Sequence, residues 1–162
     1  MKKRSLCMCL ALILCFLLSA CGGSGEEGTV NFEELKEKMI AADETMPKME
    51  SVDSESENAE HLFTNLSDLE YVKVEKYFFL YSSTGSAHEL AVVKLRSEGD
   101  VEDAKETIEE YIENRTAIFK TYAPDEVEVV ENTKILSYGS YVVMIMSPNA
   151  EAIEDVCREM LK

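Results

Sequence analysis

The sequence predicts an α+β domain, with an N-terminal helix followed by two strand–strand–helix units. These units are expected to form a four-stranded antiparallel sheet with helices packed on one face. Two observations predict it. Segments rich in β-branched and aromatic residues occur in two pairs, each joined by a turn-forming segment. An amphipathic helical pattern follows each pair. The domain is expected to span residues 31–162, enough for one hydrophobic core.

The first predicted element is an amphipathic helix over residues 30–42. Asn31 is a suitable N-cap, with Glu34 three residues later. Residues 43–58 are polar and acidic and contain Pro47, which predicts an acidic loop. A short helix is expected over residues 58–65.

The first strand–strand–helix unit begins at Tyr71. Strands are predicted over residues 71–81 and 89–96, paired as a hairpin across the turn cluster at 82–86. A long helix is predicted from Asp100 to about Lys120, ending before Pro124 because proline disfavours helix in the residue before it.

The second unit has strands predicted over residues 133–138 and 141–146, with Gly139 and Ser140 as the turn. The last helix is expected to be capped by Ser147 and opened by Pro148. Residues 90–93 and 141–146 are almost wholly apolar, which predicts central strands covered on both faces.

Residues 1–20 have the pattern of a secretory signal. A basic start is followed by an apolar run at 6–18, too short to span a membrane, and then by Ser19 and Ala20 directly before Cys21. This stretch resembles a bacterial lipoprotein signal with its lipobox. The resemblance implies diacylglycerol on the Cys21 sulfur, cleavage between Ala20 and Cys21, and anchoring at the outer face of the cell membrane. A plain signal peptide with a chance cysteine, or an uncleaved anchor, is the alternative.

Beyond the signal, the chain is strongly acidic. The first 20 residues hold three of the 16 basic residues and none of the 32 acidic ones, so residues 21–162 carry a formal charge of −19. This charge disfavours nucleic acid as a partner. Residues 21–30 comprise the lipidated cysteine and a glycine-rich, flexible spacer. Only Cys157 remains as a second cysteine after cleavage, and it lies on an apolar helix face, so no disulfide is expected.

Several segments from Tyr77 onward resemble a domain-of-unknown-function family found in lipoproteins of Gram-positive bacteria. The resemblance implies no catalytic residue, because the family has no assigned activity. It rests on the strand ending at Tyr81, residues 89–94, Arg115 late in the long helix, residues 122–124, and residues 139–143 before the last helix.

No sequence motif predicts a catalytic, metal or cofactor site. His61, His88 and Cys157 are too few and too far apart to suggest zinc. A small envelope hydrolase using Ser83, His88 and Arg115 is one alternative, although serines beside a glycine are ordinary turn residues. Weak cation binding by the acidic loop is another, although its spacing does not match an EF-hand.

Four residues form a candidate binding patch: Arg115, Tyr122, Gly139 and Tyr141. Arg115 lies on or beside an apolar stripe, so it is expected to pair with an acid or lie under an aromatic ring. Each of the four also has a structural explanation, as an ion pair, a packed corner or a turn. We therefore expect a lipid-anchored, non-enzymatic binding module without a cofactor, whose partner is an envelope protein or a small ligand.

Overall fold

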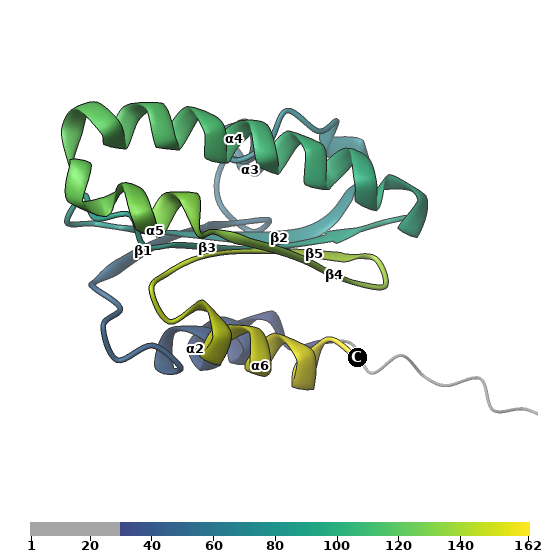
Figure 1. Ribbon diagram of the computed structural model, residues 1–162. Helices are drawn as coiled ribbons and strands as arrows, with labels where there is room; N and C mark the ends of the chain where they lie inside the picture. Colours follow the sequence, from purple (N-terminus) through teal and green to yellow (C-terminus); the bar gives the residue numbers. More distant parts are fainter. Residues whose placement is uncertain (1–29) are drawn as a thin grey trace, which may run out of the picture.

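The computed structural model describes residues 30–162. The predicted signal peptide, the lipidation and cleavage site at Cys21, and nearly all of the predicted spacer lie outside the described residues. The described chain is α+β, as predicted, and forms three layers: a central sheet with helices above and below it (Figure 1). Within residues 30–162, no helix combines the length and apolar character needed to cross a membrane.

In the described part of the chain, the sheet has five strands rather than the predicted four. They are β1 (Met49–Asp53), β2 (Val74–Ser82), β3 (Glu89–Leu95), β4 (Lys134–Tyr138) and β5 (Tyr141–Met146). All pairs are antiparallel, in the order β1-β2-β3-β5-β4. The unpredicted strand, β1, lies within the segment expected to be an acidic loop. Glu50 and Ser51 are exposed because β1 is an edge strand, so its composition resembles that of a loop.

Helices cover both faces of the sheet, which corrects the prediction of a single covered face. One face carries α4 (Val101–Tyr122) with the short helices α3 (Ala59–Phe63) and α5 (Val127–Glu131). The other carries α2 (Phe32–Ala41) and α6 (Ala150–Met160), which pack against each other. Both layers are needed because alternate residues of β2 are buried on opposite faces: Tyr77 and Phe79 towards α4, and Phe78 and Leu80 towards α2 and α6.

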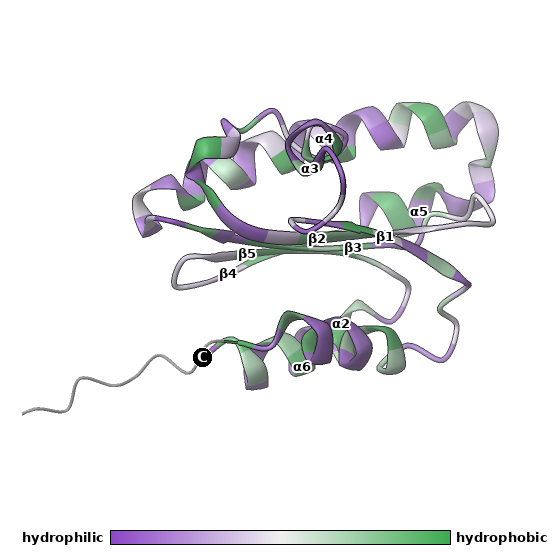
Figure 2. Ribbon diagram, turned by 180° about the vertical axis from the view of Figure 1, so that it is seen from behind, coloured by the Kyte–Doolittle hydropathy of each residue, from purple (hydrophilic) through white to green (hydrophobic). Residues whose placement is uncertain are grey.

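The two predicted hairpins, β2–β3 and β4–β5, are both present. Leu90 to Val93 in β3 are at most 1% exposed, as their continuous apolar character predicted. Both helix layers alternate between hydrophilic and hydrophobic residues along their length, as amphipathic helices do (Figure 2).

The helix ends follow the sequence signals in part. The Asn31 side chain accepts hydrogen bonds from the backbone of Glu33 and Glu34, which confirms it as the N-cap of α2. The last helix begins at Ala150 rather than Pro148. Its N-cap is Asn149 rather than Ser147, whose hydroxyl accepts from the Asn149 backbone N–H ahead of the helix and donates to the buried Asp43. Within residues 30–162, three single-turn 3₁₀ helices complete the connections: Tyr71–Lys73, Glu98–Asp100 and Pro124–Glu126.

Candidate functional site

A cleft of about 410 Å³ opens between α4 and the sheet, beside the β2–β3 turn. Its walls are mainly apolar, and its polar groups come from α4, the end of β2 and the turn after it, the first residue of β3, and Asn65 after α3. The lining residues are Val52, Leu62, Asn65, Phe79, Tyr81, Ser82, Gly85, Ser86, Glu89, Tyr111, Asn114, Arg115 and Ile118. A mostly apolar concavity with a few convergent polar groups is the usual form of a ligand site.

The polar groups of the cleft centre on Glu89. Its side chain is only 2% exposed and forms an ion pair with the guanidinium of Arg115. The Tyr111 hydroxyl donates to the other carboxylate oxygen at 2.6 Å. Tyr111 and Arg115 are four residues apart on α4, so one side of the helix presents both donors to the carboxylate.

Burial and hydrogen bonding act in opposite directions on Glu89. Burial has the largest effect and raises the pKa of its carboxyl above the ordinary value, whereas the Arg115 charge and the two donors act to lower it. Burial and the neighbouring Glu89 also raise the pKa of Tyr111, so the phenol remains a proton donor. Both oxygens of Glu89 accept hydrogen bonds, the arrangement that suits a carboxylate.

Arg115 makes a second predicted contact. Its guanidinium carbon lies 4.8 Å from the centre of the Phe119 ring, so the expectation of an acid partner or an aromatic ring is confirmed on both counts. The buried Arg115 Nε has no hydrogen-bond partner among residues 30–162.

Exposed apolar side chains gather beside the same cleft. Ile118 is 51% exposed and lines it, and Tyr122, one turn later on α4, is 71% exposed. The Tyr122 ring approaches Gly85, which also lines the cleft: a Cβ on that glycine would lie 3.3 Å from the tyrosine oxygen. Two of the three large, exposed apolar side chains in the described chain therefore lie at this mouth.

The four residues of the predicted patch do not meet. Arg115 and Tyr122 lie at the cleft, whereas Gly139 and Tyr141 lie at the β4–β5 turn, where they line a different hollow together with Val30. Tyr141 pairs with Lys94 at the far end of β3 from Glu89, about 17 Å away at roughly 3.4 Å per residue.

The serine and histidine residues of the predicted turn are also divided. The Ser83 hydroxyl donates to the Lys48 carbonyl at 2.9 Å, and Ser86, not Ser83, lies 3.1 Å from the His88 ring. Neither Ser83 nor His88 lines the cleft that contains Arg115. The three side chains named for a hydrolase thus share no cavity. The other candidate nucleophile, Cys157, is fully buried, and burial raises its pKa to about 12.

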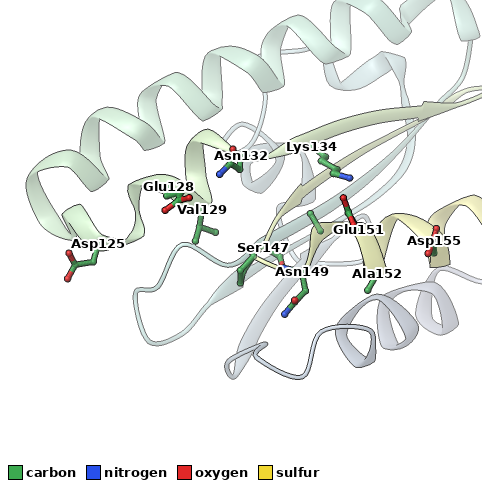
Figure 3. A pocket seen from close by; sticks show the side chains of 12 residues that line it. Asp125, Glu128, Val129, Asn132, Lys134, Ser147, Asn149, Glu151, Ala152 and Asp155 are labelled. Carbon is green, nitrogen blue, oxygen red and sulfur yellow. The ribbon is translucent and has the colours of Figure 1, made fainter.

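A larger groove of about 860 Å³ lies between α5, β4 and the start of α6 (Figure 3). Its ionisable side chains are mostly acidic, with Asp125 and Glu128 on one side and Glu151 and Asp155 on α6. Its lysine, Lys134, is paired with Glu154 at 2.8 Å. No group of three or more His, Cys, Asp or Glu side chains within residues 30–162 is arranged to hold a metal ion, either here or in the predicted acidic loop.

Glu89 and Tyr111 of the cleft are not among the candidate residues predicted from the sequence. A usable signal was present: Glu89 is a charged residue directly before an apolar run at residues 90–93. A buried acid requires a cation, and the Tyr111–Arg115 spacing on one helix face could have supplied it.

Comparison with known proteins matches residues 46–147 to the family model described as Domain of unknown function (DUF4358). The match runs from just before β1 through β5 and leaves α2 and α6 outside. It therefore begins well before Tyr77, where the sequence resemblance was placed, and it contains the whole cleft. Neither the curated proteins nor the solved structures gave a match. Since the family model covers well over half of the chain, this protein belongs to the DUF4358 family.

Proposed function

We propose that this protein is a lipid-anchored binding protein of the outer membrane face, tethered through Cys21, which holds its ligand or partner in the cleft between α4 and the sheet. The observation that carries the proposal is the combination of an open apolar cleft with an ordered polar floor, Glu89 held by Arg115 and Tyr111. Folding by itself favours covering apolar surface such as Ile118. A ligand would cover it.

The geometry favours binding over catalysis. Glu89 is engaged by two donors and is almost completely buried, so it is poorly placed to take a proton from a substrate. The Ser86 hydroxyl lines the cleft and lies 3.1 Å from His88 Nδ1, but His88 Nε2 has no hydrogen-bond partner among residues 30–162, so no acid orients that ring as in a catalytic triad. The arrangement instead suits binding, because the Glu89–Arg115 ion pair fixes a few polar groups in place among apolar side chains, where they can contact a ligand.

The position of Val30 is compatible with a membrane tether. This first described residue lies with Gly139 and Tyr141 at the end of the sheet opposite the cleft. A chain anchored through Cys21 would reach the domain at that end. The cleft would then lie on the side away from the attachment point, where a partner at the cell surface has access to it.

The anchoring half of the proposal is tested by Cys21→Ser in the full chain. We expect this variant to incorporate no labelled fatty acid and to remain an uncleaved precursor, because the thiol is the proposed acceptor. Cys157→Ala is the matched control, since that thiol is buried in the core. Normal labelling of Cys21→Ser would show that the lipid assignment is wrong.

The binding half is tested by photo-crosslinking in cells. A photoreactive residue replaces Ile118 in the cleft, and Val72, which is 74% exposed elsewhere, serves as the control position. We expect an adduct from position 118 but not from position 72. Asn114→Trp, which fills the cleft, should reduce that adduct, whereas Glu113→Trp, exposed on the same helix, should not. No adduct at 118, or identical adducts at both positions, would contradict a binding cleft.

A further inference from the structure

We propose that β1 receives an extended, basic segment of a partner protein as a sixth strand of the sheet, with its apolar side chains at the mouth of the cleft. The inference rests on the proposed binding function and adds the class of partner. It concerns the outer edge of β1, which no sequence motif indicated.

The register of β1 leaves two residues with free backbone groups. Ser54 N–H donates to the Tyr77 carbonyl at 3.1 Å, and Ser83 N–H donates to the Lys48 carbonyl at 3.0 Å. The backbone N–H and C=O groups of residues 48 and 54 therefore point towards β2. In an antiparallel pair, the backbone groups of every second residue point away from the partner strand. Met49 and Ser51 accordingly direct their N–H and C=O groups outward, and no other strand of the described chain lies on that side.

The outward groups form a short, accessible template. Ser51 is exposed, and the backbone N–H of Asp53, the next outward residue, is already bonded to the Ser56 hydroxyl at 3.0 Å. Pairing is thereby limited to the stretch around Met49 and Ser51. An added strand would lie about 4.8 Å from β1 and form main-chain bonds there.

The same register links the edge to the cleft. On β1, Glu50 and Val52 lie opposite Tyr81 and Phe79, and all of these except Glu50 line the cleft. A peptide residue opposite Val52 would lie next to the apolar wall, and the residue two positions away would lie next to Glu50. The preferred partner therefore alternates an apolar and a basic side chain on one face.

Charge determines which strand can occupy this edge. Residues 43–60 contain seven acidic residues and one lysine, and Glu50 is exposed, with its carboxylate accepting from the Tyr81 hydroxyl at 3.2 Å. A second copy of β1 would bring another acidic strand against this one, which like-charge repulsion disfavours. A basic segment of a different protein matches the edge instead.

The test uses the full chain and two synthetic peptides. One peptide repeats Lys-Ser-Val-Ser, and the other replaces each lysine with glutamate. Hydrogen–deuterium exchange is followed in segments 49–53 and 134–138, the two edges of the sheet. We expect the lysine peptide to slow exchange in 49–53 alone, the glutamate peptide to have no effect, and added salt to weaken the protection.

Matched proline variants locate the contact. Ser51→Pro removes an outward N–H that the folded sheet does not use, and edge strands tolerate proline at such positions. Ser137→Pro makes the same change on β4, where Ser137 is also an exposed edge residue. We expect Ser51→Pro to weaken peptide binding about tenfold or more, the equivalent of a lost hydrogen bond, and Ser137→Pro to leave it unchanged.

A charge reversal keeps the test informative if Ser51→Pro fails to fold. Glu50→Lys changes an exposed side chain and should transfer the preference to the glutamate peptide. Protection at 134–138 instead of 49–53, equal binding of both peptides, or no protection at either edge would each overturn the proposal. If crosslinking at position 118 still captures a ligand in that case, the cleft binds without β1 and the proposed function stands. If it also fails, both proposals fail.

Discussion

The two faces of the sheet are covered to different degrees. On one face, α2 and α6 pack against each other and bury a continuous cluster that includes Leu35, Ile153 and Cys157. On the other face the single long helix α4 has only short helices beside it, and the cleft opens where it separates from β1 and β2. None of the large exposed apolar side chains of residues 30–162 lies on α2 or α6, whereas Ile118 and Tyr122 lie on α4. One face is thus closely covered, and the other keeps a cleft and exposed apolar side chains.

The largest expected effect is the difference in the free energy of unfolding between two isoleucine-to-alanine variants, one on each face of the sheet. Ile153→Ala on α6 removes a fully buried side chain and should lower the free energy of unfolding by about 2–5 kcal/mol. Ile118→Ala on α4 should change it by at most about 0.5 kcal/mol, because that side chain is half exposed. Urea denaturation measures both. Similar losses for the two variants would show that the α4 face is as closely packed as the other.

The next largest effect on stability is expected from the Glu89–Arg115 ion pair beneath the cleft. Arg115→Met should cost about 3 kcal/mol, the lower end for a broken buried pair, because the arginine is 24% exposed while Glu89 is left buried without its cation. Replacing both partners, as Arg115→Met with Glu89→Leu, should recover much of that loss, because no uncompensated charge remains. If the double variant is no more stable than Arg115→Met, then the packing of these side chains, rather than their charges, stabilises this part of the structure.

A smaller effect is expected at Asp43, which links the end of α2 to the loop before α6. Burial acts to raise the pKa of Asp43, but hydrogen bonds from Ser147, Thr45 and Asn149 outweigh it and lower the pKa below 3.8. Asp43→Asn should therefore cost about 2 kcal/mol near neutral pH. Because folding lowers the pKa of Asp43, its carboxylate stabilises the fold fully above pH 3.8. This stabilisation is lost as the pH falls through the pKa of Asp43 in the folded protein.

The measurement at Asp43 is the difference in Tm between the wild type and Asp43→Asn as a function of pH. The Tm difference should be constant above pH 3.8 and should become smaller as the pH falls below that value. A difference that widens as the pH falls would contradict the assignment of a charged, hydrogen-bonded Asp43.

The smallest expected effect is at the turn that the sequence analysis placed in the binding patch. Gly139 has φ +53°, so Gly139→Ala should cost about 1 kcal/mol because a Cβ disfavours this left-handed conformation. Gly99→Ala, without a positive φ, is the control. We expect neither substitution to alter crosslinking at position 118. An effect of Gly139→Ala on that adduct would mean that the two ends of the sheet act together after all.

The hairpins and major helices could be predicted because their signals are local. The alternation of apolar residues, the Gly139–Ser140 turn and the Asn31 cap depend only on neighbouring residues. The single helix layer was wrong, although residues 90–93 and 141–146 already indicated burial on both faces, which one layer cannot provide. β1 was missed because an edge strand with exposed Glu50 and Ser51 has no strong pattern, and only its pairing with β2 defines it.

The candidate site was predicted in part. Arg115 was singled out because a cation beside an apolar stripe needs an explanation, and the structure gives it two partners, Glu89 and Phe119. Tyr122 lies near it, but Gly139 and Tyr141 do not. Which turn lies at which end of the sheet depends on β3 pairing with β5, a contact between segments about fifty residues apart that no local pattern encodes.

The sequence by itself determined the α+β class, the acidic surface, the principal helices and hairpins, and the resemblance of its first 21 residues to a lipoprotein signal. These follow from side-chain chemistry and short-range periodicity. Tertiary structure alone decided the strand order, the second helix layer, the pairing of Glu89 with Arg115 and the open edge of β1. Each of these depends on long-range packing, in which α4 covers only part of its sheet face, and the cleft lies in the part it leaves uncovered.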